Sequence, residues 1–204
     1  MIAVINYKAG NLASVSNALE RLGAEHLITN RIDELDRADA VIFPGVGHAQ
    51  SAMKSLGENN LTEWLKDTQK PLLGICLGMQ LFFESSDEGD TQCLGIIPGR
   101  LRLFKGENVK VPHMGWNHFN NMSDHPLLQN ITVDDYFYYV HSYYAPVTDF
   151  TTASCHYEAE FSSVVARDNF VGVQFHPEKS GTNGVQLLQN FLDFANVYSS
   201  KLNV

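Results

Sequence analysis

The chain has few cysteines, a deficit of basic residues and no long apolar run. Only three of its 204 residues are cysteines, Cys76, Cys93 and Cys155, and no two of them form a Cys-x-x-Cys pair. An odd number at this spacing suggests neither a disulfide framework nor a zinc site. Lys and Arg number 14 against 23 Asp and Glu, so the net charge is -9. This balance argues against a general binder of nucleic acid or of anionic membranes.

The amino-terminal stretch lacks the features of a targeting segment. MIAVINYKAG has no basic n-region, and its apolar run is too short for a signal peptide or a membrane span. We therefore expect a protein of the reducing cytoplasm with no membrane partner. With 44% hydrophobic and 18% charged residues, the composition is that of an ordinary globular protein, and we expect residues 1–204 to form a single domain.

The first half of the chain alternates short apolar runs with segments of helical periodicity. Leu12, Val15, Leu19 and Leu22 recur at the spacing of one helix face, and Gly23 is placed to end that helix. Strands that alternate with helices at such intervals are typical of βαβ units in a mainly parallel sheet. The predicted strands are 2–5, 26–29, 40–43 and 71–75, and the further predicted helices are 48–56, 61–68 and 77–84.

The second half has a different pattern. Four apolar segments follow one another across short turns, which indicates an antiparallel portion, and an amphipathic helix is predicted over Val185–Ala195. The sequence therefore predicts a single-domain α/β fold, with a mainly parallel central sheet flanked by helices and an antiparallel portion in the second half. The four segments are 136–145, 152–157, 162–167 and 170–175.

One cysteine stands between two glycines in GICLGMQ, at the end of a predicted strand. A lone Cys76 in this position is more often an inert core residue than a nucleophile. However, Gly74 and Gly78 make a G-x-C-x-G pattern analogous to the G-x-S-x-G elbow of hydrolases. Such an elbow exposes the nucleophile at a helix N-terminus, where the dipole favours a thiolate, and the N–H of Leu77 points at a developing oxyanion.

A base for this cysteine is indicated by VQFHPEKS (173–180). His176 precedes Pro177, whose ring favours an extended conformation for the residue before it. Residues two apart in an extended segment point the same way, so His176 and Glu178 can lie side by side, and a carboxylate beside an imidazole orients it. Taken alone, His-Pro-Glu is as consistent with a solvated strand end as with a catalytic pair. Combined with the elbow, it favours a Cys-His-Glu triad.

These motifs, together with the Gly-rich FPGVG segment, resemble the class I (triad) glutamine amidotransferases. The resemblance covers nearly the whole chain and implies that Cys76 attacks the carboxamide of glutamine. His176, oriented by Glu178, would transfer protons, and glutamate would be released from a γ-glutamyl thioester without any cofactor or metal. The resemblance implies an oxyanion hole at Gly45, Val46, Gly47 and Leu77, and glutamine-binding positions at Gln80, Glu88, Ser142 and Tyr143.

Within that family, PGVG, PHMGWN and YYVHSY are most similar to a branch that supplies ammonia for histidine biosynthesis. The resemblance implies a partner, a (β/α)8-barrel cyclase, which forms a heterodimer with this chain and receives ammonia through an internal passage. It also implies a poor glutaminase in isolation, so we predict that the free chain holds the Gly45–Val46 segment in an inactive orientation. The implied partner-facing residues are Asn11, Met114, Trp116, Asn117, Tyr138 and Lys179.

Other interpretations stay open at this point. A paralogous glutaminase could feed a different synthase, for instance in surface-sugar biosynthesis, and Asn6 and Lys8 depart from the usual pattern near the expected interface. A catalytically silent interaction module of the same fold is another alternative, although the three triad residues count against it. A third alternative is a cysteine peptidase of related architecture, but the glutamine-binding positions Gln80 and Glu88 do not support it. A metal site from His113, His118 and His125 is disfavoured because no helical i, i+4 pair is present.

Overall fold

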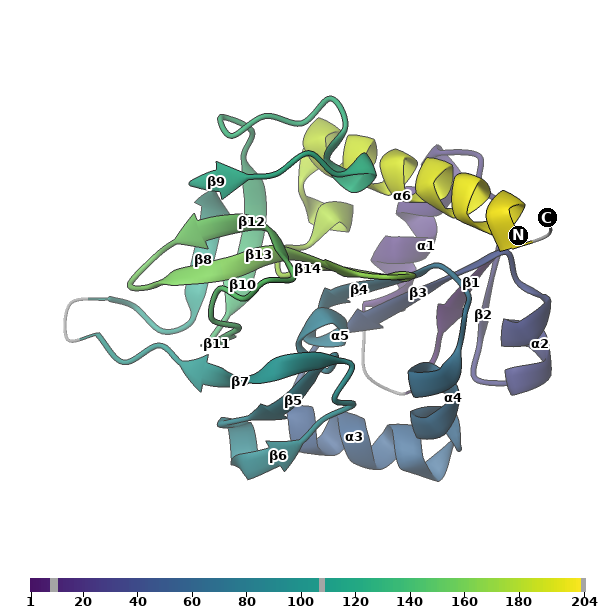
Figure 1. The fold of residues 1–204 in the computed structure, drawn as a ribbon, viewed down its shortest axis with the longest axis horizontal. Coiled ribbons are helices and arrows are strands. Elements are labelled where there is room, and N and C mark those ends of the chain that lie inside the picture. The colour runs from purple at the N-terminus through teal and green to yellow at the C-terminus, as the bar shows by residue number, and fades with distance from the viewer. Residues whose placement is uncertain (8–10, 107–108, 203–204) are drawn as a thin grey trace.

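The structure of the chain is a computed structural model that describes residues 1–7, 11–106 and 109–202. Eight strands form its central sheet: β1 (Ile2–Ile5), β2 (His26–Thr29), β3 (Ala40–Gly45), β4 (Leu72–Cys76), β9 (Asn121–Met122), β12 (Thr151–His156), β13 (Glu160–Arg167) and β14 (Phe170–Val173). Their order is β2-β1-β3-β4-β14-β13-β12-β9 (Figure 1). The first five strands of this order run parallel, and the last three continue the sheet antiparallel. The predicted α/β fold with its antiparallel portion is confirmed.

Apolar side chains occupy both faces of the parallel strands. In β1, Ile2 and Val4 pack into the core on one face of the sheet, whereas Ala3 and Ile5 pack into the core on the other. Because successive side chains of a strand point to opposite faces, a continuous apolar run needs cover on both sides.

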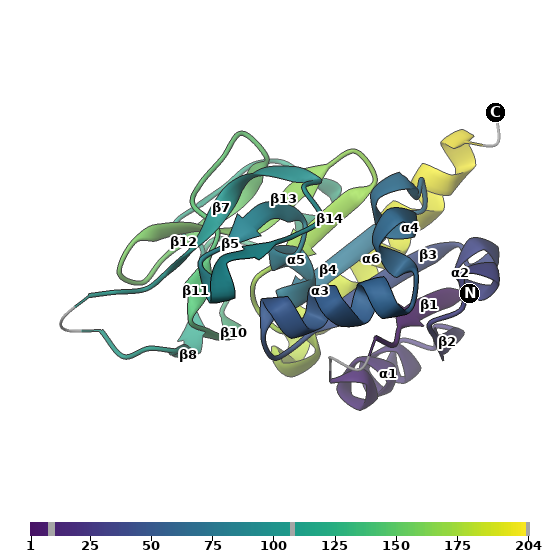
Figure 2. The same cartoon turned by 90° about the horizontal axis from the view of Figure 1, so that it is seen from below.

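Helices supply that cover on each face. The first core includes buried residues of α1 (Leu12–Arg21) and α6 (Gly181–Leu202). The second core contains residues of four further helices, and Figure 2 views the molecule from the side on which α3 and α4 lie. These helices are α2 (Ile32–Arg37), α3 (Ala49–Glu58), α4 (Leu61–Asp67) and α5 (Leu77–Gln80). Within the described ranges, no helix is both long and apolar enough to cross a membrane.

Two smaller sheets lie beside the central one. A four-stranded sheet has the order β11-β7-β5-β6, and β8 pairs with β10 in a two-stranded antiparallel ribbon. Three short 3-10 helices, η1 (Glu88–Asp90), η2 (Pro126–Leu128) and η3 (Pro177–Lys179), complete the fold. The strands are β5 (Phe83–Ser86), β6 (Thr91–Gln92), β7 (Ile97–Leu103), β8 (His113–Asn117), β10 (Phe137–His141) and β11 (Tyr143–Tyr144).

The structure corrects two of the predicted elements. The helix predicted over 77–84 ends at Gln80; residues 81–82 form a turn, and the last two residues of the prediction begin strand β5, which pairs with β7. An apolar run this short does not distinguish helix from strand, and pairing with a later segment decides the outcome. The strand predicted over 136–145 is interrupted at Ser142, because β10 and β11 pair with different sheets.

Candidate active site

The ends of three neighbouring strands bring the predicted triad and the Gly-rich segment together. In the register of the sheet, Gly45 at the end of β3 lies opposite Cys76 at the end of β4. On the other side of β4, Ile75 lies opposite Val173, the last residue of β14, and His176 follows three residues later. All three strands are parallel, so their carboxyl ends meet at one edge of the sheet. The candidate site is built at this edge.

The turn at Cys76 is tight and strained. Cys76 has φ 53° and ψ -108°, a backbone conformation that L-residues rarely adopt, and α5 begins at the next residue. Gly78 lies so close to β3 that an added Cβ would be 1.9 Å from the carbonyl oxygen of Phe43. At Gly74 an added Cβ would lie 2.7 Å from the backbone nitrogen of Met79. The two glycines of the elbow are therefore required for close backbone packing.

The thiol of Cys76 lies in a largely buried, polar environment. The residue is only 7% exposed. Its Sγ lies 3.8 Å from the carbonyl oxygen of Val140, and the side-chain amide Nε2 of Gln174 donates a hydrogen bond to Sγ at 3.7 Å. The inert-core interpretation of Cys76 does not account for these polar neighbours, because buried structural cysteines usually behave as small apolar residues.

His176 and Glu178 form the buried pair that the sequence predicts. Nδ1 of His176 and Oε1 of Glu178 are 2.8 Å apart, and each side chain is only 1% exposed. Burial alone lowers the pKa of His176, but the negative charge of Cys76 and the hydrogen bond to Glu178 outweigh it and raise this pKa to about 10. Within the described residues Nε2 of His176 has no hydrogen-bond partner, so it is available to exchange a proton.

The predicted oxyanion segment borders the same space. Gly45 is buried, whereas Val46 is 40% exposed and Gly47 has a positive φ of 106°. An added Cβ on Gly45 would lie 2.6 Å from the hydroxyl of Tyr7 and 2.8 Å from the Cβ of Leu77. The backbone at Gly45 is therefore confined between the end of β1 and the start of α5. The predicted inactive orientation of the Gly45–Val46 segment stays a prediction.

A cavity of about 280 Å³ connects these elements. Its lining includes all four predicted glutamine-binding residues together with Cys76 and His176. Both hydrogens of the Gln80 amide are donated within the protein, to the carbonyl oxygen of Tyr143 at 2.8 Å and to Oε1 of Gln174 at 2.9 Å. Only Oε1 of Gln80 is therefore left to face a ligand. The four residues are Gln80, Glu88, Ser142 and Tyr143.

One of these residues also has a structural role. Oε2 of Glu88 accepts a hydrogen bond of 2.6 Å from the backbone nitrogen of Ala49, the first residue of α3. A carboxylate at a helix N-terminus compensates the unpaired N–H groups there. Glu88 thus fixes α3 beside the cavity.

Two polar residues of the site were missed in the sequence. Gln174 contacts both Cys76 and Gln80, and His141 lines the cavity. Alternation along an extended segment could have placed Gln174 on the same side as His176, because the two are two residues apart. His141 gave no comparable signal, since its position depends on the pairing of β10 with β8.

The residues predicted to face a partner are spread over several elements. On β8, Met114 is 62% and Trp116 55% exposed, and the Trp116 ring packs edge-on against Tyr138 of β10. Asn117 and Asn11 are half-buried, and Lys179 is exposed in η3. Lys8, which departs from the family pattern, lies outside the described residues.

The three histidines considered as metal ligands have other contacts. Nδ1 of His113 contacts Nε2 of His141 at 3.0 Å, while Nδ1 of His118 contacts the carbonyl oxygen of Phe119 at 3.1 Å. Nδ1 of His125 accepts a hydrogen bond from a nearby backbone N–H. In the part of the chain that the structure describes, no three His, Cys, Asp or Glu side chains are grouped so that they could hold a metal ion.

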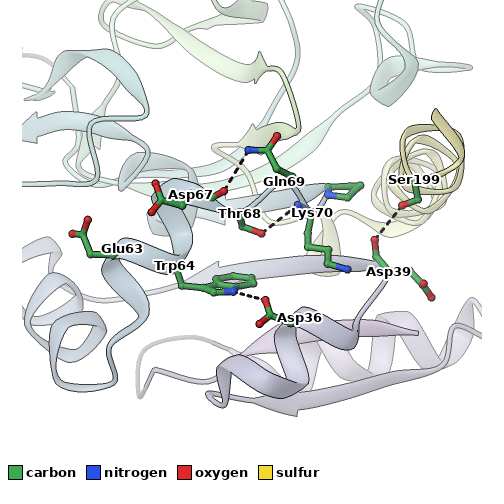
Figure 3. A pocket seen from close by; sticks show the side chains of 10 residues that line it. Asp36, Asp39, Glu63, Trp64, Asp67, Thr68, Gln69, Lys70 and Ser199 are labelled. Carbon is green, nitrogen blue, oxygen red and sulfur yellow. Dashed lines mark hydrogen bonds between the residues drawn. The ribbon is translucent and has the colours of Figure 1, made fainter. Parts of the chain in front are cut away.

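A second and larger cavity, of about 570 Å³, lies at the opposite ends of β3 and β4 (Figure 3). The indole Nε1 of Trp64 donates to Oδ1 of Asp36 at its edge. The ten described residues that line it include neither cysteine nor histidine. The smaller cavity is the candidate active site because the perturbed histidine and the strained cysteine both border it.

The chain belongs to the class I glutamine amidotransferases. The sequence profile of that family, Glutamine amidotransferase class-I, matches residues 3–194. The solved structure of PurLQS from Thermotoga maritima superposes with a TM-score of 0.67 at 18% identity, covering 95% of this chain and 97% of that one. At this identity the superposition shows the shared fold alone.

Sequence relatives within the family are considerably more similar. Imidazole glycerol phosphate synthase subunit HisH 2 of Legionella pneumophila (strain Paris) is 49% identical over 193 residues, which cover 94% of this chain and 97% of the relative. Imidazole glycerol phosphate synthase subunit HisH of Bacteroides fragilis (strain YCH46) is 46% identical over 194 residues, with coverage of 94% and 98%.

Substitution of Gly78 tests the packing of the elbow. We expect Gly78→Ala to destabilise the protein by about 1–3 kcal/mol or more, because the new methyl group must displace the Phe43 carbonyl. Gly57→Ala in α3 is the matched control, since no heavy atom lies within 4 Å of its added Cβ. That control should be neutral or stabilising by up to about 1 kcal/mol. Denaturant unfolding measures both, and equal effects of the two variants would contradict the packing argument.

The titration of His176 tests its electrostatic contact with Cys76. The negative charge of Cys76 helps to raise the pKa of His176 to about 10, so Cys76→Ala should lower that pKa. The measurement is the NMR chemical shift of the His176 ring as a function of pH. Cys93→Ala, which removes a half-buried cysteine of another part of the fold, should leave the titration of His176 where it is. An unchanged His176 titration in Cys76→Ala would show that the two groups do not interact.

Proposed function

We propose that this chain is the glutaminase subunit of an imidazole glycerol phosphate synthase and hydrolyses glutamine to glutamate and ammonia. The observation that carries the proposal is the strained Cys76 in one cavity with the His176–Glu178 pair. The two relatives described above, at 46% and 49% identity over nearly their whole length, bear the name of that synthase.

The geometry supports a two-step reaction. The Cys76 thiol gives its proton to His176 as its sulfur attacks the carboxamide carbon of glutamine. The negative charge then moves to the carbonyl oxygen, which backbone N–H groups of Leu77 and of the 45–47 segment would stabilise. The carbon–nitrogen bond then breaks, and His176 gives its proton to the leaving nitrogen to form ammonia. Water next attacks the thioester while His176 takes one of its protons. The products are glutamate and the restored cysteine.

Glu178 keeps the histidine in the orientation that this reaction needs. Its hydrogen bond fixes Nδ1, so Nε2 is the ring nitrogen directed to the reacting groups. The carboxylate also stabilises the imidazolium that forms when His176 accepts a proton. The side chains that line the cavity would hold the head group of glutamine, and Glu88 and Tyr143 would bind its ammonium and carboxylate groups.

A cyclase with a (β/α)8-barrel is the proposed partner, in a cytoplasmic heterodimer. Ammonia in neutral water is mostly protonated and then not nucleophilic, so a dry passage between two active sites serves the chemistry. The exposed Trp116 and Met114 and the neighbouring Tyr138 offer apolar anchors for such an interface. Asn11, Asn117 and Lys179 would add polar contacts to it.

The pathway is tested by reconstitution. When the purified chain is mixed with the cyclase and its nucleotide substrate, glutamine-dependent product should form. Cys76→Ala should abolish this activity, whereas ammonium salts should still support product formation in the same mixture. Product formation from glutamine by the variant would rule out Cys76 as nucleophile. Absence of any complex with the cyclase would direct the search to another synthase, while leaving glutamine hydrolysis to be measured.

The resting activity of the isolated chain is a separate prediction. We expect glutamine hydrolysis by the chain alone to be slow and to rise when the loaded partner binds, because the peptide beside a glycine can rotate at low steric cost. Glutamate release is measured with and without the partner. Full turnover by the isolated chain would contradict an inactive Gly45–Val46 segment.

A further inference from the structure

A continuous chain of neutral hydrogen-bonding groups reaches the Cys76 sulfur from the side of β14. Its last member is Gln174, which is fully buried directly after that strand. The side-chain amide of Gln174 donates to Sγ of Cys76 and accepts from Nε2 of Gln80. Its backbone N–H is bound to the carbonyl of Ser163 at 2.8 Å, so the residue is anchored to the sheet.

The orientation of the Gln174 amide follows from the groups behind it. A carbonyl oxygen can only accept, so the contact with the Tyr143 carbonyl fixes the Gln80 side chain with its NH2 group toward Tyr143. The second hydrogen of that NH2 group points at Gln174, which must present its oxygen there. The Gln174 NH2 group is then directed at the sulfur. A flipped amide would place two donors against each other and an oxygen against Sγ.

Two buried histidines hold the Tyr143 carbonyl from the other side. Nδ1 of His141 lies 2.8 Å from that oxygen and must therefore carry a hydrogen, which leaves Nε2 as an acceptor for His113. The pairing of β8 with β10 places these two histidines opposite each other. Burial lowers the pKa of His141 to about 3 and that of His113 to about 4, so both rings are neutral at physiological pH.

This run of hydrogen-bonded groups ends near the surface at the side chain of Asn117. Its side-chain Nδ2 lies 3.4 Å from Nε2 of His113 and also donates to the carbonyl of His156 at 3.0 Å. Donation therefore runs from Asn117 through His113 and His141 to the Tyr143 carbonyl oxygen, and from Gln80 both to that oxygen and, through Gln174, to the sulfur of Cys76. Every amide and imidazole orientation in this run is set by a neighbour that can act in only one way.

We propose that Gln174 is a positioning residue for Cys76, and that Gln80 holds the Gln174 amide in the orientation that directs its N–H group at the sulfur. An N–H donated to sulfur favours the thiolate over the thiol. Gln174 therefore supports the reactive form of the nucleophile without adding a charge of its own. The inference adds to the proposed glutaminase chemistry but can be tested without glutamine.

The test is the pH dependence of alkylation of Cys76 by iodoacetamide, with the modified peptide identified by mass spectrometry. Gln174→Glu keeps the acceptor for Gln80 but replaces the donor to sulfur with a carboxylate. Because a hydrogen bond to a charged group has a strength that corresponds to about one pH unit or more, the alkylation profile should move up by about one unit. At a fixed pH below the midpoint of the profile, alkylation should be about tenfold slower.

A matched control lies at the other end of the same strand. Asn169 precedes β14, is also buried, and donates its two amide hydrogens to the carbonyls of Thr68 and Lys70. Asn169→Asp is therefore the same amide-to-acid change at a buried site remote from the sulfur. It should destabilise the protein but leave the alkylation profile of Cys76 unchanged. An equal shift in both variants, or a Gln174→Glu profile that overlies the wild type, would overturn the proposal.

A second pair of variants tests the role of Gln80 without introducing charge. Gln174→Met removes the donor to sulfur, and Gln80→Met removes the groups that orient Gln174. Each should slow alkylation at low pH, and the double variant should be no slower than Gln174→Met alone, since Gln80 acts through Gln174. Additive effects would show that Gln80 does not act through Gln174. If the Gln174 variants do not fold, a wild-type profile in Gln80→Met overturns the orientation argument by itself.

These outcomes are independent of the substrate. Iodoacetamide reports on Cys76 whether or not the chain hydrolyses glutamine. A shifted alkylation profile in a protein that leaves glutamine intact would refute the proposed function and retain the role of Gln174. Normal glutamine hydrolysis with an unshifted alkylation profile would support the proposed function and refute the role of Gln174.

Discussion

The chain reverses from strand to helix at a single residue, and the candidate site depends on that reversal. Cys76 takes a positive φ with a ψ of -108°, a conformation that costs about 1–3 kcal/mol for a residue other than glycine. Packing around the turn holds it there. Gly78 lies against the Phe43 carbonyl of β3, and Gly74 lies against the first turn of α5. Because β3 and β4 are in register, the same contacts place Gly45 opposite the sulfur-bearing residue.

Two polar systems of different character meet at the sulfur. One is the His176–Glu178 pair, in which an imidazole and a carboxyl group are both removed from water. The other consists of amides and imidazoles that burial keeps uncharged. Buried charges are costly unless they are paired, so a second charged group beside Cys76 would compete with the first. A neutral amide can therefore hold the sulfur without adding a second charge beside the His176–Glu178 pair.

The sequence was sufficient for the parts of the site that follow from local chain geometry. The elbow at Cys76, the extended His176–Glu178 pair and most of the parallel strands are set by spacing, glycine and proline within a few residues. Strand β5 was predicted as helix because only its pairing with β7 distinguishes the two. A similar reason explains why His141 was missed.

The pairing of β8 with β10 joins segments that lie far apart in the chain, and no local pattern signals it. His113 and His141 meet only through that pairing. The contact of Gln174 with Cys76 was closer to being predictable, since the alternation used for His176 and Glu178 extends two residues back. A side-chain amide is neither a nucleophile nor a base, however, so no catalytic motif in the sequence includes Gln174.

The distribution of unpaired polar atoms supports the location of the site independently of any motif. Among the described residues, four buried side-chain atoms lack a hydrogen-bond partner; one belongs to Thr152, and the other three belong to Tyr7, His176 and Glu178 around the elbow. Each such atom costs about 1–3 kcal/mol. Remote amides are satisfied, as in Asn169 at the far end of β14. The unpaired donors and acceptors therefore gather around the strained cysteine. A polar ligand bound in the cavity is the kind of group that could form the missing hydrogen bonds.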